Sequence, residues 1–529
     1  MKLKPIALIA ATTLALAACT NTVSLESKNS GGSAPTPAPS SVGSDPTMPV
    51  STGDAVAIDA PMPDVPDGLE DFYNQDLEWF DCDGLDCADV TVPMDYENPD
   101  GETITIRMKK SAALGEPIGN LLVNPGGPGG SGQDMADFAN MYFSEDIIEH
   151  FNVIGFDPRG VGDSAPVDCL DDAQLATYLD TTFPDTDEGD EQAKAAVDEL
   201  VAGCEANTGE LLQYVGTREA AQDMDVLRHV LGDPRLYYVG YSYGTTLGGM
   251  YSELFPQNVG RVILDGAVDD SIPGFDQTVA QAKGFEQALD AYIEYCIDNG
   301  SCPLGDTLED ARAKVSEMFD DIVDNPIAVG DRELTQTGLF YGIAMPLYDD
   351  TAWFALDIAF DEVVNQGKGD MFLTMFDLYM SREGDSFTNN MVEANWAINC
   401  ADAHVTGDEA EWEEKADQLA VEAPIFGDVM GYSQYLCSVM PGGEDGPLGP
   451  FVAAGSEPIV VVGTTGDPAT PYEWSEAFAD SLENSVFVTW EGEGHTAYGR
   501  AGDCINNPLD DYLLRGDVPE DGLTCGADE

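Results

Sequence analysis

The sequence contains few basic residues. Its 529 residues include 21 lysines and arginines against 98 aspartates and glutamates, which gives a formal net charge of −77. A chain with this charge is repelled by phosphate backbones and by anionic lipid headgroups, so nucleic acid is excluded as a partner. Two explanations of the acidity stay open: adaptation to high salt, or simply a soluble and well-hydrated exterior.

A hydrophobic run long enough to span a membrane is missing from the N-terminus. Residues 6–18 are mostly apolar, but this run is too short for a spanning helix. It follows Lys2 and Lys4 and ends in small residues just before Cys19, which is the layout of a secretory signal. A cysteine at this point resembles the bacterial lipobox, whose thiol is diacylated. We therefore predict a signal peptide over residues 1–18 and a lipid anchor at Cys19. The expected location is the bacterial cell envelope, on the outer side of the cytoplasmic membrane, or outside the cell as a secreted protein.

Aromatic residues are absent between residues 20 and 67, and the first aromatic residue of the chain is Phe72. This stretch is rich in serine, proline, glycine and threonine, so it cannot bury enough apolar surface to offset the entropy of ordering it. Residues 19–68 are therefore predicted to form a disordered tether, and the folded body is expected to begin at residue 69.

The cysteines lack the spacing of a metal site. None shows the paired CxxC or Cys-His pattern that tetrahedral zinc requires, and the acidic clusters lack the ligand and glycine spacing of a calcium loop. No metal and no cofactor are predicted. Without Cys19, ten cysteines remain in an exported chain, and an even number favours disulfides. Their spacing suggests pairs of sequence neighbours: Cys82 with Cys87, Cys169 with Cys204, Cys296 with Cys302, Cys400 with Cys437, and Cys504 with Cys525.

Apolar runs bounded by turn residues predict eight strands and an α/β fold with a mostly parallel sheet. The runs cover residues 88–92, 103–109, 118–125, 151–157, 235–242, 260–267, 457–465 and 485–492. The first two are expected to be antiparallel, and helical patterns lie between the others. Residues 271–455 are aromatic-rich and mostly helical in pattern, which indicates an inserted helical cap. The cap divides the core into residues 69–270 and 456–529.

The motif GYSYG at residues 240–244 carries the strongest chemical signal. It follows an apolar strand and opens a helix of small residues, which is the context of a nucleophile elbow. Glycines are needed there because the chain must turn sharply and leave no side chain beside the serine. Ser242 is the predicted nucleophile, and the N–H of Tyr243 is a predicted oxyanion donor at the positive end of the helix dipole.

A second oxyanion donor is expected in the loop NPGGPGGSG, residues 124–132, after the strand at 118–125. A phosphate cradle is the competing interpretation of such a loop. However, this loop lacks the GKS/T ending and the GxGxxG spacing of phosphate-binding loops, and the net negative charge of the chain disfavours phosphate. The N–H of Gly127 is the predicted donor.

The predicted base is one of only four histidines. His150 and His229 lie in helical patterns, where packing or surface roles are expected. His495 lies in GEGHTAYG just past the last strand, where a glycine-flanked loop can return an imidazole over the sheet edge. His404 is the alternative.

The acid that orients the imidazole has two candidates. Asp467, in GTTGDPATP, directly follows the strand at 457–465, and Asp265 ends the strand at 260–267. Asp467 is preferred because its loop opens a helix and points over the same edge. The order Ser242, Asp467, His495 is that of α/β-hydrolases.

Together these motifs, with GFDPRGVGDSAPVDC and LDGAVD, resemble the exported tripeptidyl aminopeptidase-like branch of the proline iminopeptidase relatives. The resemblance runs from about Trp79 to Cys525. It implies an α/β-hydrolase fold with a helical cap, a serine nucleophile, and removal of short peptides from free N-termini. Pro125 stands where the iminopeptidases have histidine, so proline specificity does not follow.

An exopeptidase must pair the ammonium of its substrate, because a desolvated charge is costly without a partner. Candidates near the mouth of the cap are Glu393 and Asp402, with Asp269 and Asp270 behind them. Asp402 is the predicted amine-binding residue. The expected function is that of a serine exopeptidase acting on peptides. The alternatives are a carboxylesterase or lipase with the same three residues, and a surface lipoprotein without catalysis.

Overall fold

The structure is a computed structural model that describes residues 53–183, 186–300, 302–403, 405–443 and 448–526. The predicted signal peptide, the predicted lipid anchor at Cys19, the first part of the predicted tether and His404 lie outside the described residues.

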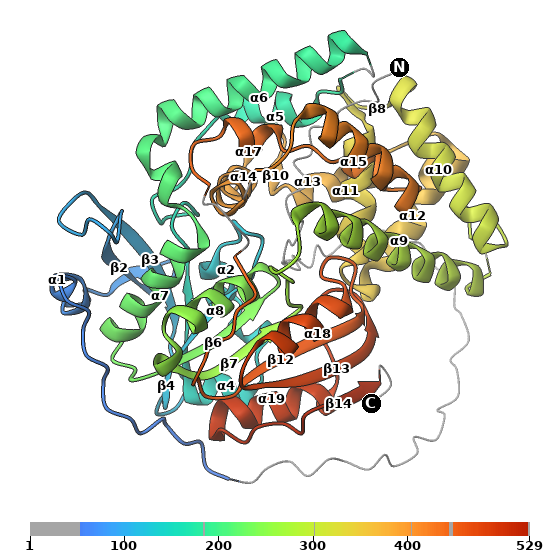
Figure 1. Cartoon of the computed structure of the whole chain (residues 1–529). Helices are drawn as coiled ribbons and strands as arrows, with labels where there is room; N and C mark the ends of the chain where they lie inside the picture. Colours follow the sequence, from blue (N-terminus) through green and yellow to red (C-terminus); the bar gives the residue numbers. More distant parts are fainter. Residues whose placement is uncertain (1–52, 184–185, 301, 404, 444–447, 527–529) are drawn as a thin grey trace, which may run out of the picture.

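A ten-stranded sheet forms the centre of the fold (Figure 1). Its strands, in spatial order, are β1 (Phe80–Cys82), β2 (Leu85–Pro93), β3 (Thr103–Ser111), β5 (Phe151–Phe156), β4 (Gly119–Asn124), β6 (Leu236–Tyr241), β7 (Val259–Asp265), β12 (Ile459–Gly466), β13 (Ser485–Glu493) and β14 (Leu523–Gly526). The first three strands and the β3–β5 pair are antiparallel. The pairs from β5 to β14 are parallel. The predicted α/β class with a mostly parallel sheet is confirmed.

The predicted number of eight strands is wrong. All eight expected strands form, and two short edge strands, β1 and β14, complete the sheet. They are three and four residues long, and β1 is largely exposed, so neither contains an apolar run that a pattern can reveal. Both are next to disulfides, at Cys82 and Cys525. By themselves these short segments would bury little apolar surface. The bridges attach them to the edges of the sheet.

Helices cover both faces of the sheet. On one side lie α2 (Gly132–Asp137), α3 (Ala139–Tyr142), α4 (Glu145–His150) and α19 (Asp503–Arg515), and on the other α7 (Thr217–Val230), α8 (Tyr243–Leu254) and α18 (Tyr472–Ser481). Strand β6 is buried along its whole length. Tyr237 and Val239 pack in the hydrophobic cluster on the side of α2 and α19, and Tyr238 packs in the cluster on the side of α7 and α8. This is because alternate side chains of a strand point to opposite faces of the sheet.

The segment between β7 and β12 is mainly helical and has a hydrophobic core of its own (Figure 1). Its helices are α9 (Gly274–Asp298), α10 (Leu308–Asp324), α11 (Gln336–Leu347), α12 (Trp353–Asp361), α13 (Asp370–Tyr379), α14 (Met391–Asp402), α15 (Glu409–Glu422), α16 (Gly427–Met430) and α17 (Tyr435–Val439). Two small hairpins, β8 (Ile327–Val329) with β9 (Arg332–Leu334) and β10 (Arg382–Glu383) with β11 (Ser386–Phe387), lie between them. We call this segment the cap.

The boundary between cap and core does not follow the sequence. Helix α5 (Asp172–Asp180) comes from an excursion between β5 and β6, yet Leu175 and Leu179 pack in the core of the cap. Arg382 of the cap reinforces this contact with an ion pair to Asp180. Helix α14 does the opposite, since Ala394 and other residues of this helix pack in the core cluster of the sheet. Helices α5 and α14 therefore both join the cap to the core.

All five predicted disulfides are present. They join Cys82 with Cys87, Cys169 with Cys204, Cys296 with Cys302, Cys400 with Cys437, and Cys504 with Cys525. One of them ties α14 to α17, and another ties the loop after β5 to α6 (Asp187–Asn207). The bridges therefore hold loop-rich parts of both the core and the cap.

The N-terminal residues of the described part lie against the core. The N–H of Val56 donates to the carbonyl of Leu514, and the N–H of Ile58 donates to the hydroxyl of Tyr237, both at 2.8 Å. These residues fall within the stretch expected to be a tether. Short helix α1 (Glu70–Tyr73) follows. Among the described residues, no helix is both long and apolar enough to cross a bilayer.

Candidate active site

Ser242 sits at a sharp turn between β6 and α8. Its backbone has φ 57° and ψ −125°, a conformation that side-chain-bearing residues rarely adopt and that marks a strained functional turn. The neighbouring glycines make this turn possible. A Cβ on Gly240 would lie 2.3 Å from the carbonyl oxygen of Gly244, and one on Gly244 would lie 2.9 Å from the carbonyl oxygen of Asn124. The turn is therefore the nucleophile elbow that the GYSYG motif predicts.

His495 and Asp467 meet at the ends of adjacent strands, β13 and β12. Nδ1 of His495 lies 2.9 Å from Oδ1 and 2.8 Å from Oδ2 of the carboxylate. Backbone N–H groups of Ala469, Thr470 and Thr496 donate to the same carboxylate, as does the Thr470 hydroxyl at 3.0 Å. The carboxylate is thus held rigidly, and it orients the imidazole with Nε2 directed away from the acid.

Asp265, the alternative acid, is placed differently. Its carboxylate accepts the N–H groups of Ala497 at 2.9 Å and of Tyr498 at 2.7 Å. Its main-chain oxygen accepts the N–H of Ser242 at 2.9 Å. Burial raises the pKa of Asp265 to about 6. Asp265 therefore connects the elbow of Ser242 with the loop that follows His495.

The glycine-rich loop after β4 packs directly against the elbow. A Cβ on Gly126 would lie 2.9 Å from Cβ of Ser242 and 3.2 Å from the nitrogen of Tyr243, so only glycine fits there. The side chain of Asn124 accepts the N–H of Gly126. Gly127 follows with φ 115°. As the first residue of α8, Tyr243 has an N–H without an intrahelical partner. The loop that contains Gly127 thus packs, through Gly126, against the turn that contains Ser242 and Tyr243.

Oγ of Ser242 and Nε2 of His495 are both buried. Ser242 is fully buried and His495 is 5% exposed. Within the described part of the chain, neither Oγ of Ser242 nor Nε2 of His495 has a hydrogen-bond partner. An unpaired hydroxyl and an unpaired imidazole nitrogen are costly to bury, so both atoms are candidates for a functional role. Catalytic hydrogen bonds of this kind often tighten only when substrate is bound.

The predicted amine-binding residue, Asp402, lies at the end of α14 beside the first turn of α7. Its carboxylate accepts the N–H of Thr217 at 2.8 Å and the Thr217 hydroxyl at 2.6 Å. The same hydroxyl lies 2.5 Å from the hydroxyl of Tyr243. Asp402 is thus connected through Thr217 to the residue that follows the serine, and it has a clear structural role at the N-terminus of α7.

The other candidate acids have different environments. Glu393 accepts the N–H of Leu170, and burial raises its pKa to about 7. Asp269 accepts the N–H and hydroxyl of Ser271.

Asp270 has a buried oxygen, Oδ2, with no hydrogen-bond partner in the described part of the chain. Burial raises the pKa of this group to about 8, and the negative charges of Asp402 and Asp269 also raise it. A hydrogen bond from Thr246 acts in the opposite direction and lowers the pKa. Asp270 therefore has a carboxylate oxygen without a hydrogen bond among the described residues, and two other acidic side chains lie near it.

Two of the remaining histidines occupy the positions expected for structural residues. His150 ends α4, and its Nδ1 lies 2.8 Å from the carbonyl oxygen of Asp146. His229 lies in α7 and packs edge-on against Tyr73.

Sequence reasoning missed three residues that contact His495: Tyr348, Thr470 and Arg500, whose guanidinium donates to the carbonyl of His495 at 2.9 Å. The carbonyl of Tyr348, in the cap just after α11, accepts the N–H of His495 at 2.8 Å. Its ring meets the imidazole edge-on, with centroids 5.3 Å apart. The hydroxyl of Thr470 lies 3.3 Å from Nδ1. The only sequence signal for Thr470 is its place three residues after Asp467, a spacing typical of side-chain-capped turns. Nothing in the local sequence marks Tyr348.

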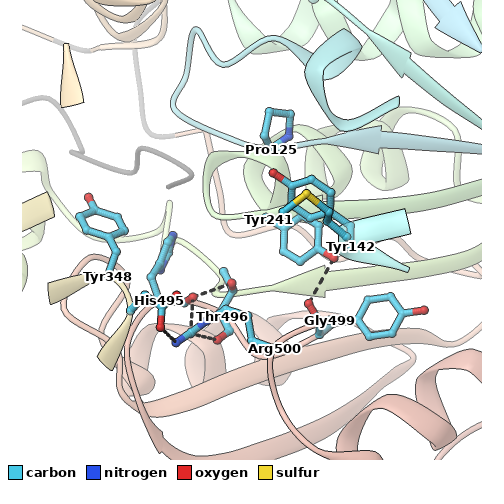
Figure 2. Close-up of a pocket in the computed structure, with 11 residues that line it drawn as sticks. Pro125, Tyr142, Tyr241, Tyr348, His495, Thr496, Gly499 and Arg500 are labelled. Carbon is cyan, nitrogen blue, oxygen red and sulfur yellow. Dashed lines mark hydrogen bonds and ion pairs between the residues drawn. The ribbon is translucent and has the colours of Figure 1, made fainter. Parts of the chain in front are cut away.

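A pocket of about 180 Å³ opens beside His495 (Figure 2). In Figure 2, Tyr348 and His495 lie on one side of it, and Tyr142, Tyr241 and Pro125 lie on the other. We call it the tyrosine pocket. Its lining is completed by Met141, Asp349, Thr496, Tyr498, Gly499 and Arg500.

Comparison with known proteins agrees with this fold. The family model described as "alpha/beta hydrolase fold" matches residues 119–310, and the one described as "TAP-like protein" matches residues 423–525. The serine protease Hip1 of Mycobacterium tuberculosis is 34% identical over 481 residues, which cover 85% of this chain and 91% of that protein. Carboxylesterase B of the same species is 33% identical over 447 residues, covering 83% and 86%. A tripeptidyl aminopeptidase of Streptomyces coelicolor is 29% identical over 474 residues, covering 85% and 86%.

The fold and these relatives define an α/β-hydrolase enzyme. Within this class the chain belongs to the TAP-like family, as the sequence motifs predict, and it is similar to proteins named as serine protease and tripeptidyl aminopeptidase.

Proposed function

We propose that the protein is a serine exopeptidase that releases short peptides, most simply tripeptides, from free N-termini. Ser242 is the nucleophile, His495 the general base and Asp467 the acid that orients it. The observation that carries this proposal is the contact between Nδ1 of His495 and both oxygens of Asp467, at the strand ends next to the Ser242 elbow. The name of the Streptomyces relative supports the tripeptidyl specificity.

The reaction follows from these positions. Nε2 of His495 takes the proton of Ser242 as Oγ attacks the scissile carbonyl, and Asp467 stabilises the resulting imidazolium. The N–H groups of Gly127 and Tyr243 stabilise the oxyanion of the tetrahedral intermediate. The imidazolium then gives its proton to the leaving amine, which leaves an ester on Ser242. A water molecule, activated by His495, hydrolyses this acyl-enzyme and restores the free serine.

Recognition of the N-terminal ammonium requires an acid on the cap side of the elbow. Asp402 is the residue that the sequence predicts. Asp270 lies close enough to it for the negative charge of Asp402 to raise the pKa of Asp270. The charges of both acids also raise the pKa of Tyr243, the residue that follows the nucleophile. Asp270 has the carboxylate oxygen that is not engaged within the described residues. We therefore propose that Asp270 and Asp402 together form the amine site, with Asp270 making the direct contact.

The exopeptidase proposal is tested by matched peptides with free and acetylated N-termini, alongside a methyl ester of a short acyl group. Acetylation removes a charge-assisted hydrogen bond and leaves a buried acid unpaired, so we expect kcat/KM to fall by about tenfold or more. Asp270→Asn and Asp402→Asn should penalise only the free-amine peptides and leave the simple ester unchanged. Equal hydrolysis of free and blocked peptides would remove the exopeptidase reading, and turnover of esters alone would support a carboxylesterase.

The pH dependence of kcat/KM tests the role of Asp270 separately. Its pKa of about 8 in the free enzyme means that much of the carboxyl is protonated near neutrality. For free-amine peptides kcat/KM should rise as the pH approaches 8, because only the carboxylate pairs with ammonium. Above this pH it should fall again, because a peptide α-amino group has a pKa of about 7.7–8.0. Asp270→Asn should remove the rise, and the simple ester should show neither this rise nor the fall.

The same group predicts a change in stability with a definite sign. The pKa of Asp270 is raised from 3.8 to about 8 in the folded protein, so the folded state keeps a proton that the unfolded chain releases. Stability from this group is therefore present below pH 4 and lost as the pH rises through 8. In thermal unfolding, Asp270→Asn should raise the Tm at pH 8 and leave it unchanged at pH 4. An equal shift at both pH values would show that the carboxyl is not protonated in the native state.

We also propose that the protein is exported and lipid-anchored through Cys19, in the bacterial cell envelope. The five disulfides support an oxidising compartment. Cys19→Ala should prevent labelling by a radioactive fatty acid and shift the protein from the membrane fraction to the soluble fraction. Labelling that persists in this variant would contradict an anchor at Cys19.

A further inference from the structure

The tyrosine pocket lies on a defined side of the reacting groups. His495 must deliver its proton to the leaving nitrogen, so the peptide that leaves lies on the imidazole side of the scissile bond. The lining of the pocket includes His495, Thr496 directly after it, and Tyr241 directly before Ser242. It does not include the oxyanion donors Gly127 and Tyr243. Because the lining includes the base but neither Ser242 nor the oxyanion donors, the pocket borders the site on the histidine side, where the leaving group departs.

One wall of the pocket lies at the surface, and the cap residues Tyr348 and Asp349 also line the pocket. Its outer wall is formed by Met141 and Tyr142 at the end of α3, and Met141 is 46% exposed. In an exopeptidase the leaving portion is the remainder of a longer chain, which must reach solvent. The open side of the site is the one that can accommodate it.

The walls of the pocket are mainly apolar, and the two charged residues that line it, Asp349 and Arg500, pair with each other at 3.4 Å. The hydroxyl of Tyr498 donates to Asp510, that of Tyr241 donates to the carbonyl of Tyr498, and that of Tyr348 lies 3.5 Å from the hydroxyl of Tyr379. With these hydroxyls engaged by other protein groups, the rings contribute mainly apolar surface to the pocket, together with Pro125 and Met141.

The size of the pocket fits one large side chain. Its volume is about 180 Å³, and a cavity of about 150 Å³ is sufficient for a benzene ring. Aromatic and aliphatic side chains of this size gain the most from burial against tyrosine rings.

We propose that the tyrosine pocket binds the side chain of the first residue of the leaving peptide, and that it selects large apolar or aromatic residues there. This inference rests on the proposed peptidase function. It assigns a second specificity element to the site, on the side opposite to amine recognition.

Acyl transfer tests this inference directly. The donor is a tripeptide methyl ester with a free N-terminus, because methanol is too small to occupy the pocket. Glycinamide, alaninamide, leucinamide and phenylalaninamide compete with water for the acyl-enzyme, and mass spectrometry measures the ratio of transfer to hydrolysis. We expect transfer to leucinamide and phenylalaninamide to exceed transfer to glycinamide by about tenfold or more. A parallel series of tetrapeptides and pentapeptides that differ only after the cleaved bond should show the same order in kcat/KM.

Variants at the mouth of the pocket provide the structural control. Tyr142→Ala and Met141→Ala remove wall surface, so each should lower the preference for phenylalaninamide over glycinamide at least threefold. Phe138→Ala is the matched control, because Phe138 is 49% exposed, lies beside the same helix and does not line the pocket. This variant should keep the wild-type preference.

The possible failures are distinguishable. Equal transfer to all four amides, together with equal kcat/KM across the peptide series, overturns the pocket assignment. The comparison of free and blocked peptides still tests the exopeptidase proposal in that case. Equal hydrolysis of free and blocked peptides, with the transfer preference retained, overturns amine recognition alone. A preference that is unchanged in both Tyr142→Ala and Met141→Ala also overturns the assignment to this pocket.

Discussion

Ser242→Ala is expected to abolish covalent labelling by a fluorophosphonate and to reduce peptide turnover to the background rate. The structure places Oγ at a strained turn, buried and without a hydrogen-bond partner among the described residues. In serine proteases, loss of the nucleophile or of its histidine costs on the order of 10⁶-fold in kcat, because the two act as a unit. His495→Ala should therefore label far more slowly than the wild type, although it retains the serine.

Ser252→Ala is the matched control for this prediction. Ser252 is buried on the same helix, where its hydroxyl donates to the carbonyl of Gly248, so it shares the environment of α8 without contacting the site. This variant should label and turn over like the wild type. Full labelling of Ser242→Ala by the fluorophosphonate would place the nucleophile on another residue.

Asp467→Asn is expected to produce the second largest loss, of about 10⁴-fold in kcat, because an amide favours the wrong imidazole tautomer. Asp265→Asn should be much milder. The amide nitrogen would face the N–H groups of Ala497 and Tyr498, so the loop after His495 would be held less firmly. We expect a lower Tm and a reduction in kcat of about one to two orders of magnitude, in line with a small misplacement of the histidine.

The comparison of these two variants decides which acid orients the imidazole. Steady-state kinetics on one peptide substrate and thermal unfolding should be measured for both. Full turnover in Asp467→Asn together with abolished turnover in Asp265→Asn would show that the acid is Asp265, whatever contacts Asp467 makes.

The elements of the site that depend on local sequence could be predicted. The GYSYG and NPGGPGGSG segments are recognisable because the elbow and the adjoining loop leave no space for a Cβ at Gly240, Gly244 and Gly126. Contact between Asp467 and His495 could also be expected. The two residues follow neighbouring parallel strands, whose carboxyl ends share one edge of the sheet.

The acid that binds the substrate amine depends on contacts that no local pattern shows. Asp402 was chosen for its place near a cysteine in the cap, yet its carboxylate is engaged with Thr217 at the start of α7. Asp270, named as a secondary candidate, has the unpaired oxygen. In a chain with 98 acidic residues, which carboxylate remains unpaired is decided by the neighbours that folding brings to it, and these neighbours come from distant segments.

By itself the sequence determined the α/β class, the strand order along the chain and the backbone of the elbow, because each depends on local periodicity or on glycine. The cysteine spacing suggested the five disulfide pairs, and the structure contains all five. Only the tertiary structure decided how cap and core share helices α5 and α14, and how Tyr348 of the cap comes to hold His495. It also decided the formation of the tyrosine pocket, whose walls come from five separate segments. Such contacts join residues far apart in the chain, and they form when packed surfaces meet, so no local pattern encodes them.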